Sequence, residues 1–232
     1  MHHNLTKKAI LKSKHNLTHG SKTIITISVG QPNHEGDKLL STLIAANKQF
    51  SFIRIMVCDS LQRHTMKITS PLSIEELHDI SVQLGSEWIE RNNMYIKALT
   101  VPYHISRWDE WLYHPDFNYK QRVISDLYLN DSSFKSSILD TVNEFITRNP
   151  ERLLVDSQTA FNLSRDYLLE ECAVMLLLAD EEFEYEIYPS QRNKALDYVY
   201  QAVISKVNSK LMQAVSIKFK NISYNEIKHE LA

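Results

Sequence analysis

The chain has 232 residues, of which 43% are hydrophobic and 23% charged, and it contains only two cysteines. This composition excludes a disordered polypeptide, and the cysteine count excludes a disulfide framework or a cysteine-rich metal site. The formal net charge is −2, but residues 1–34 carry +5 and the remainder carries −7. We therefore expect a basic N-terminal arm at 1–21, which is either a contact for a polyanion such as nucleic acid or a solvated, frayed terminus.

The apolar runs of the sequence predict a soluble, cytoplasmic protein with no membrane contact. The longest of them, at 173–179, is much shorter than the ~20 residues that cross a bilayer, and no signal peptide opens the chain. Cys58 and Cys172 each lie in an apolar run. We expect both to be buried free thiols.

The first half of the chain predicts a βαβ unit and a further strand. Residues 23–28 are β-branched and apolar on both faces, which is typical of a buried parallel strand. A loop with glycine and proline leads to a helix at about 37–48 and a second strand at 52–58. Ser73 and Glu76 form a capping box that opens a helix to about residue 95, and 99–103 is a third strand.

The second half is mostly helical. Helices are predicted at about 116–129, 132–147 and 157–179, a strand at 183–188, and a last helix at about 191–212. The sequence shows neither an internal repeat nor a domain boundary after residue 22. Residues 22–232 therefore predict a single α/β domain, an open and mostly parallel sheet flanked by helices.

Motifs for nucleotide binding are missing from the sequence. With only four glycines, the chain contains neither G-x-G-x-x-G nor G-x-x-x-x-G-K-[ST], and the ATP-binding signatures of class I aminoacyl-tRNA synthetases are also absent. His15 and His19 have a spacing found in metal sites, but no carboxylate is near them in the sequence. We expect no metal and no cofactor, so an acyl substrate would have to arrive already activated.

Ser28 ends the first predicted strand. Ligands of open α/β sheets bind beyond the carboxyl ends of the strands, where loop N–H groups can also stabilise an oxyanion. From its position alone, Ser28 is either a nucleophile or simply a small residue that ends the strand. The segment Thr26-x-Ser28-x-Gly30 resembles the hydrolase elbow but lacks its first glycine, and nothing marks His104 as a triad base.

A tyrosine, a glutamate and a second tyrosine follow late in the chain. Tyr167 and Glu171 are four residues apart and share one face of a predicted helix. Because an apolar run follows Glu171, its carboxylate needs a partner or a proton. That partner is either a substrate ammonium or an arginine such as Arg165 or Arg107. Tyr188 precedes a proline, which holds it in an extended conformation at a strand end.

Taken in order, Ser28, Tyr167, Glu171 and Tyr188 resemble the tRNA-dependent cyclodipeptide synthases. The segment Asp59-Ser-Leu-Gln-Arg-His64 is similar to the family's Asp-x-Leu-x-Arg-His segment, and residues 86–92 and 106–111 are similar too. The resemblance covers about residues 22–205.

Two further positions indicate a subgroup. Gln31 stands three residues after the serine, and Pro189 follows the last tyrosine. Both resemble the subgroup that is often written XYP.

The resemblance implies a Rossmann-like fold similar to the catalytic domain of class I tyrosyl- and tryptophanyl-tRNA synthetases. It implies an aminoacyltransferase that uses two aminoacyl-tRNAs and no ATP to make a cyclic dipeptide, a diketopiperazine. Ser28 would carry first an aminoacyl and then a dipeptidyl group in a ping-pong reaction. Tyr167 and Glu171 would hold the ammonium, and Tyr188 would relay protons. No histidine base next to Ser28 is evident, so the ribose hydroxyl of the tRNA is a candidate for its activation.

Substrate contacts can be predicted around this centre. Thr26 faces the same way as Ser28 and is expected to line the first aminoacyl pocket, with Gln31 and Met56 at the second. The predicted tRNA contacts are basic residues, namely Lys7, Lys8, Lys12, Lys14, Arg91 and Lys97. We expect a monomer. Two other interpretations remain, a serine hydrolase or acyltransferase that uses Ser28 without tRNA, and a non-catalytic tRNA- or protein-binding module.

Overall fold

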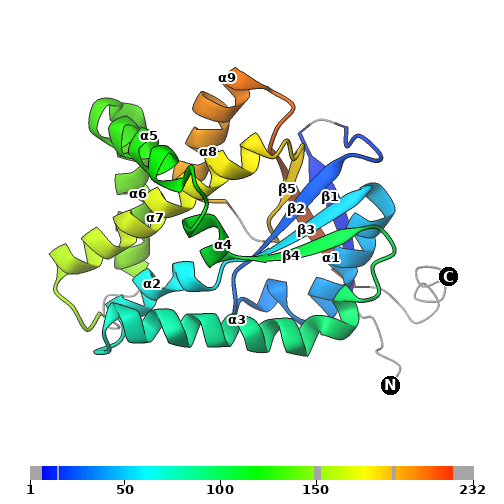
Figure 1. The fold of residues 1–232 in the computed structure, drawn as a ribbon, viewed down its shortest axis with the longest axis horizontal. Helices are drawn as coiled ribbons and strands as arrows, with labels where there is room; N and C mark the ends of the chain where they lie inside the picture. The colour runs from blue at the N-terminus through cyan, green and yellow to red at the C-terminus, as the bar shows by residue number, and fades with distance from the viewer. Residues whose placement is uncertain (1–6, 15, 149–152, 190–191, 222–232) are drawn as a thin grey trace.

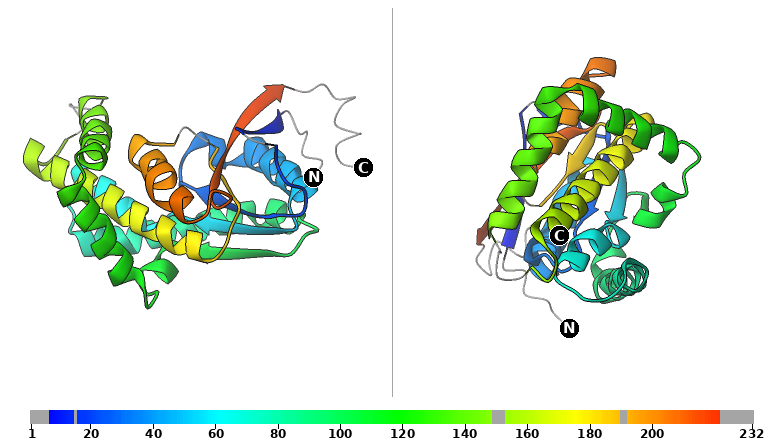
Figure 2. Two further views of the ribbon diagram at one scale, coloured as in Figure 1. Left: turned by 90° about the horizontal axis from the view of Figure 1, so that it is seen from above. Right: turned by 90° about the vertical axis from the view of Figure 1, so that its left-hand side faces the viewer.

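The computed structural model describes residues 7–14, 16–148, 153–189 and 192–221. These residues form a six-stranded sheet with helices on both faces (Figure 1), and the layers are seen from two further sides in Figure 2. The strand order is β1-β6-β5-β2-β3-β4. The sequence prediction of a single α/β domain with a mostly parallel sheet is therefore confirmed.

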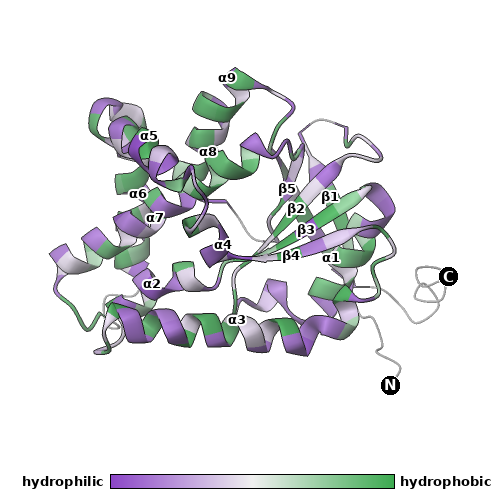
Figure 3. Ribbon diagram, viewed as in Figure 1, coloured by the Kyte–Doolittle hydropathy of each residue, from purple (hydrophilic) through white to green (hydrophobic). Residues whose placement is uncertain are grey.

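Five of the strands are parallel. They are β2 (Lys22–Ile27), β3 (Phe52–Val57), β4 (Tyr103–Arg107), β5 (Tyr185–Ile187) and β6 (Gln213–Asn221). Figure 3 shows β2 and β3 largely in the hydrophobic colour, whereas the edge strand β4 is mostly hydrophilic. This difference follows from position, because central parallel strands are covered on both faces.

The sixth strand, β1 (Lys7–Ser13), lies within the segment that the sequence predicted to be an arm. It pairs antiparallel with β6 along its whole length. Ala9 is buried and Leu11 packs against the cluster under α1, while Lys8 and Lys12 point outward and are exposed. This alternation is typical of a half-buried strand. Because they pair with β6, residues 7–13 are part of the sheet rather than an arm outside the domain. Residues 1–6 lie outside the described residues.

Each face of the sheet has its own helical layer. One face is covered by α1 (Gly36–Gln49) and α3 (Ile74–Ile96), and the predicted capping box of Ser73 and Glu76 is present at the start of α3. The other face is covered by α5 (Phe117–Asn130), α6 (Ser132–Arg148), α7 (Ser157–Asp180) and α8 (Lys194–Val199). None of the described helices is long and apolar enough to cross a membrane.

Short helical segments complete the fold. The helices are α2 (Arg63–Ile68), α4 (Trp108–Leu112) and α9 (Ser205–Val207). Two 3-10 turns, η1 (Pro32–His34) and η2 (Ser60–Gln62), follow β2 and β3, and η4 (Tyr200–Ile204) is a π-helical segment between α8 and α9. Cys58 and Cys172 are buried free thiols, as predicted.

Two element boundaries differ from the sequence prediction. The strand predicted at 99–103 begins only at Tyr103, because the N–H groups of Thr100 and Val101 are bound by the side chain of Asn47 at 2.8 and 3.1 Å. The last helix stops at residue 207 instead of 212. The chain turns there and adds β6 to the sheet, a strand that the helical pattern did not reveal.

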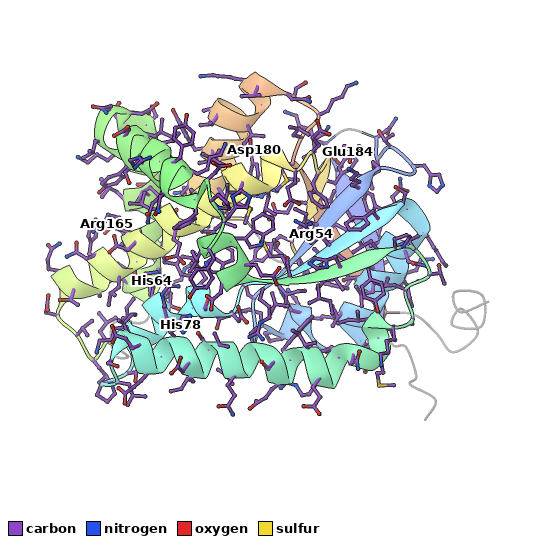
Figure 4. The ribbon with its side chains drawn as sticks, in the orientation of Figure 1. Arg54, His64, His78, Arg165, Asp180 and Glu184 are labelled. Atoms are coloured by element: carbon purple, nitrogen blue, oxygen red, sulfur yellow. The ribbon has the colours of Figure 1, made fainter. Side chains whose placement is uncertain are left out.

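A buried carboxylate fixes α7 to the elements beside the sheet. Glu170 accepts hydrogen bonds from Arg63 Nη1 at 3.0 Å and from Trp108 Nε1 at 2.8 Å. It also lies 3.1 Å from Nε2 of His64, the residue labelled in Figure 4. Burial alone would raise the pKa of Glu170, but the hydrogen bonds from His64 and Arg63 outweigh it and lower the pKa. The ionised carboxylate thus joins α2 and α4 to α7.

A second buried carboxylate, Asp59, follows β3. It accepts hydrogen bonds from the backbone N–H of Ser60 at 2.9 Å and of Trp108 at 3.3 Å, and from Arg107 Nε at 2.6 Å. A Cβ atom at Gly85 would overlap its carboxylate, so α3 can approach only because residue 85 is glycine. The Asp-x-Leu-x-Arg-His segment therefore has a structural role around the site.

Removing the Glu170 carboxylate should destabilise the fold strongly. In Glu170→Ala, the buried guanidinium of Arg63 loses its partner, so we expect the free energy of unfolding to fall by roughly 3–5 kcal/mol. Urea titration measures this. The matched control is Asp166→Ala on the same helix, whose partly exposed ion pair with Arg165 should contribute under about 1 kcal/mol. Equal losses in the two variants would show that Glu170 has no special structural role.

Candidate active site

Two cavities meet at the carboxyl ends of β2 and β5. The smaller has a volume of about 300 Å³ and the larger about 500 Å³. Residues that line both include Ser28, Gln31, Tyr167, Tyr188 and Asn193. Three of the four residues predicted to be catalytic therefore stand where the cavities join. The fourth, Glu171, lines the larger cavity.

The hydroxyl of Ser28 forms a side-chain hydrogen bond with the phenol of Tyr188. The two oxygens are 3.3 Å apart, and either can donate. Burial raises the pKa of Tyr188 to about 12, although the hydrogen bond with Ser28 works in the opposite direction. Tyr188 is therefore a neutral phenol near pH 7, able to donate and to accept a proton in a hydrogen bond.

A histidine does lie beside Ser28, and the sequence analysis did not predict it. His34 Nδ1 accepts a hydrogen bond from the backbone N–H of Ser28 at 2.8 Å, and its ring packs edge-on against Tyr188 with centroids 5.4 Å apart. The carbonyl of His34 accepts from Trp88 Nε1 at 3.0 Å. His34 thus fixes the turn after β2 through two hydrogen bonds.

His34 is not placed to act as a base for Ser28. Its Nδ1 lone pair is used by the backbone N–H, and burial lowers the pKa of His34 to about 4, so the ring is neutral. His104, the other candidate, lies on β4 with its side chain 53% exposed, 3.8 Å from Glu110. No Ser–His–acid triad is therefore formed among the residues that the structure describes.

Glu171 lies in a different environment from its neighbour Glu170. Burial raises the pKa of Glu171 to about 8, opposed by a hydrogen bond from Asn193 Nδ2 at 3.0 Å, and the charge of Glu186 raises it further. Burial, with the nearby Glu171, also raises the pKa of Tyr167 well above its usual range. Without a ligand, the carboxyl group of Glu171 is therefore mostly protonated near pH 7.

The arginines considered as partners of Glu171 are engaged elsewhere. Arg165 pairs with Asp166 at 2.7 Å on the outer part of α7 (Figure 4). Arg107 binds Asp59. Neither interaction involves Glu171, and the arginine whose charge acts on Glu171, lowering its pKa, is Arg192. Binding of a substrate ammonium by Glu171 stays a prediction.

Asn193 is a site residue that the sequence did not reveal. Its Oδ1 accepts a hydrogen bond from the backbone N–H of Leu196 at 2.9 Å and caps α8, while its Nδ2 donates to Glu171. The cap fixes the amide, so the donor is held toward Glu171. An asparagine before a helical pattern is an N-cap signal. The pattern does not predict that the same side-chain amide also donates to a residue of α7.

The predicted pocket residues do not all reach the cavities. Thr26 lines the larger cavity and Gln31 lines both. Met56, in contrast, is fully buried in the apolar cluster under α7 and lines neither cavity. The next residue on the same face of this chain segment, Cys58, reaches the larger cavity instead, because it lies just beyond the end of β3.

The residues predicted to contact tRNA lie in separate places. Lys7, Lys8 and Lys12 are on β1, and Lys14 follows it. Arg91 on α3 pairs with Glu35 at 3.1 Å. Lys97 is the C-cap of α3. This end of α3 leads to the amino end of β4, whereas the cavities lie at the carboxyl ends of the strands.

Metal ligands do not gather in the part of the chain that the structure describes. No group of three or more histidine, cysteine, aspartate or glutamate side chains there could hold an ion. Of the two histidines with metal-like spacing, His15 lies outside the described residues.

The raised pKa of Glu171 should make stability depend on pH. Between its ordinary pKa near 4.5 and its folded pKa of about 8, the folded protein holds a proton that the unfolded chain has lost. The free energy of unfolding should therefore fall as pH rises through this window, by up to about 1.4 kcal/mol per pH unit. Glu171→Gln should remove that slope in urea titrations from pH 6 to 8, whereas Glu90→Gln, on the exposed side of α3, should retain it. A slope that is unchanged in Glu171→Gln would contradict the assignment.

Comparison with solved structures places this geometry in a family. No protein-family model matches the sequence, and none of the curated proteins matches it. Among solved structures, a CDPS from Fluoribacter dumoffii is 34% identical with a TM-score of 0.88, covering 93% of this chain and 100% of that one. A cyclodipeptide synthase from Candidatus Glomeribacter gigasporarum, bound to Phe-tRNAPhe, is 20% identical with a TM-score of 0.70, covering 87% of this chain and 89% of that one.

A more distant structure shares the fold. A Mycobacterium tuberculosis protein, described as relating cyclodipeptide synthetases to type I tRNA synthetases, is 12% identical with a TM-score of 0.67, covering 94% of this chain and 95% of that one. This likeness agrees with the Rossmann-like architecture. With the 34% identity to the Fluoribacter protein over nearly the whole chain, it follows that the chain belongs to the cyclodipeptide synthase family.

Proposed function

We propose that this chain makes a cyclic dipeptide from two aminoacyl-tRNAs, with Ser28 as the covalent nucleophile. The observation that carries the proposal is the position of the Ser28 hydroxyl, 3.3 Å from the Tyr188 phenol where two cavities meet. Two cavities around one nucleophile suit a reaction that joins two amino acids. Glu171, which holds a proton when the site is empty, lies on the wall of the larger cavity.

The first step is attack of Ser28 Oγ on the ester carbonyl of an aminoacyl-tRNA. A new ester forms on Ser28, the bond to the ribose oxygen breaks, and the serine proton ends on that oxygen. His34 is neutral and its Nδ1 is already engaged, and Tyr188 with a pKa of about 12 is a weak base. The departing ribose oxygen is therefore the final proton acceptor, with Tyr188 as a hydrogen-bonding relay.

Glu171 gives the acyl-enzyme its ammonium site. The buried carboxyl group loses its proton when an ammonium binds, because the ion pair offsets the desolvation that raised its pKa. Tyr167, one turn earlier on α7, lies on the same face. Glu171 then takes one proton from the ammonium, and the freed amine attacks the ester carbonyl of the second aminoacyl-tRNA. The bond to the ribose oxygen breaks and that oxygen takes the second proton of the amine, so a dipeptidyl group remains on Ser28 and the second tRNA leaves.

Cyclisation releases the product. The free amine of the dipeptidyl group attacks its own ester carbonyl, the bond to Ser28 Oγ breaks, and the proton returns to the serine through Tyr188. Both reacting groups belong to one held intermediate, so the effective concentration is high. The chemistry needs neither ATP nor a cofactor.

The subgroup written XYP is part of the proposal. Gln31 lines both cavities, and Pro189 follows Tyr188, with its carbonyl accepting a hydrogen bond from Asn33 Nδ2 at 3.2 Å. The proposal keeps the monomer that the sequence analysis expected. Charged tRNAs belong to the cytoplasm, so we place the reaction there.

The antiparallel pair of β1 and β6, here called the basic ribbon, supports a tRNA contact. Its outward face bears four exposed lysines, Lys8, Lys12, Lys218 and Lys220, and neither strand contains an acidic residue. Lys8 and Lys220 are directly opposite each other. A row of exposed lysines attracts the phosphate groups of a nucleic acid.

The direction of the basic ribbon also fits. Ile187, the last residue of β5, pairs with Val215, and β6 continues to Asn221 beside Lys7. The ribbon therefore extends past the carboxyl ends of the central strands, toward the side on which the cavities open. A tRNA acceptor stem lying along it would have its 3′ end near Ser28.

Ser28→Ala should abolish both the product and its covalent intermediate. Wild-type protein incubated with charged tRNAs should yield cyclic dipeptide, detected by mass spectrometry, and a mass increase on the peptide that contains Ser28. The control is Ser125→Ala, a partly exposed serine of α5 whose hydroxyl donates to the carbonyl of Gln121 in the same helix, which should keep full activity. Product at the wild-type rate from Ser28→Ala would refute the covalent mechanism.

Lysine substitutions on the basic ribbon should weaken tRNA binding without changing the chemical step. Lys12→Ala, Lys218→Ala and Lys220→Ala should raise KM for charged tRNA, leave kcat unchanged, and each lower the salt-dependence slope by roughly one counterion. Lys206→Ala on α9 is the matched exposed control. An unchanged KM in the triple variant would exclude the ribbon as the tRNA contact.

A further inference from the structure

The deep end of the larger cavity contains a buried ion pair. Glu186 lies two residues before Tyr188 and Thr26 two residues before Ser28, so strand alternation places both on the same sheet face as the reacting hydroxyls. Arg192 forms a salt bridge with Glu186, and the two side chains are only 9% and 3% exposed. All three residues line the cavity.

The Glu186 carboxylate is well supplied with donors. Oε1 accepts from Thr26 Oγ1 at 3.2 Å, and Oε2 accepts from the Tyr200 hydroxyl at 2.9 Å as well as from Arg192. The Arg192 guanidinium lies 3.8 Å from the centre of the Tyr200 ring. Packing and hydrogen bonds thus hold the pair rigidly in place.

Arg192 has donor capacity left over. Among the described residues, its hydrogen bond to Glu186 uses Nη2, while Nη1 is 3.7 Å from Asp197 Oδ1, beyond hydrogen-bond distance. A guanidinium has five N–H donors. An acceptor on a ligand in this cavity would therefore find a fixed donor group.

The charges of the deep end cancel. Arg192 and Glu186 neutralise each other in the cavity wall, while Asp197, which also pairs with Arg192 at 3.7 Å, is half-exposed and does not line the cavity. In the proposed function, Glu171 binds the ammonium of the aminoacyl group. At the mouth of the cavity, Lys194 pairs with Glu144 at 2.9 Å. The other side chains around the pair are apolar or nearly so, namely Cys58, Met175 and Leu196.

We propose that the larger cavity selects a first aminoacyl group whose side chain is neutral and hydrogen-bonding, a hydroxyl or carboxamide, and that Arg192 and Glu186 are the residues that select it. This inference rests on the proposed function, since it assigns the side chain of the group that Ser28 would carry. Arg192 donates to the side-chain oxygen, and Glu186 Oε1 accepts from its O–H or N–H.

Other side chains fit the pair less well. An aliphatic or aromatic group would leave the remaining N–H donors of Arg192 buried without acceptors. Because unsatisfied buried donors cost free energy, a polar site of this kind rejects an apolar ligand. A carboxylate or an ammonium would add an uncompensated charge to a pair that is already neutral, in a place largely removed from water.

The direct test is the acylation of Ser28 by individual aminoacyl-tRNAs. The wild-type protein is mixed, in separate reactions, with tRNA charged with serine, threonine, asparagine, glutamine, leucine, phenylalanine, glutamate or lysine. Rapid quenching and intact-mass analysis give the rate of each mass increase. At least one of the first four should acylate Ser28 roughly tenfold to hundredfold faster than any of the last four.

A double variant tests the assigned residues. Arg192→Met with Glu186→Gln removes both charges together, so neither is left buried without a partner. The preference for the neutral polar group over leucine should fall by about tenfold or more. The matched control is Arg54→Met with Glu181→Gln, which removes another Arg–Glu pair far from the cavity walls and should leave the preference unchanged.

The possible outcomes separate the two proposals. Fastest acylation by an apolar or charged aminoacyl group would overturn the selectivity while leaving the covalent function intact. No acylation by any aminoacyl-tRNA would overturn the proposed function and the selectivity with it. A preference that survives in a folded double variant, checked by circular dichroism, would overturn the roles of Arg192 and Glu186. The wild-type panel decides the selectivity even if that variant does not fold.

Discussion

The position of α7 depends on the buried carboxylate of Glu170. Two elements from different parts of the sequence supply its donors, α2 through Arg63 and His64, and α4 through Trp108. Because an ionised group is stable there only when all of these donors are present, α7 has one allowed position over the sheet. That position brings the neighbouring face of the helix, with Tyr167 and Glu171, to the ends of β2 and β5.

Adjacent glutamates in α7 show how environment decides chemistry. The hydrogen bonds from His64 and Arg63 lower the pKa of Glu170, whereas burial with a single amide donor raises the pKa of Glu171 to about 8. Successive helix positions point about 100° apart, so one residue meets the basic residues of α2 and the other meets a cavity. The first holds the fold together, and the second is free for a ligand.

The sequence predicted the elements that are defined by local signals. The capping box at Ser73, the apolar strands before Ser28 and Cys58, and the long helix with Glu171 are all present, because each follows from short-range patterns of hydrophobicity and capping. The strands β1 and β6 were missed. Their residues alternate with lysines, and such a pattern reads as a solvated segment until a partner strand, about two hundred residues away, covers its apolar face.

The sequence by itself determined the fold class and the family resemblance, together with the identities of Ser28, Tyr167, Glu171 and Tyr188, since these depend on residue types and their order. Only the tertiary structure decided which groups surround them. It excluded Met56 from the cavity and brought His34, Asn193 and the pair of Glu186 and Arg192 to it. The physical reason is that burial and hydrogen bonding between distant segments set the protonation of each group, and neither can be read from positions along the chain.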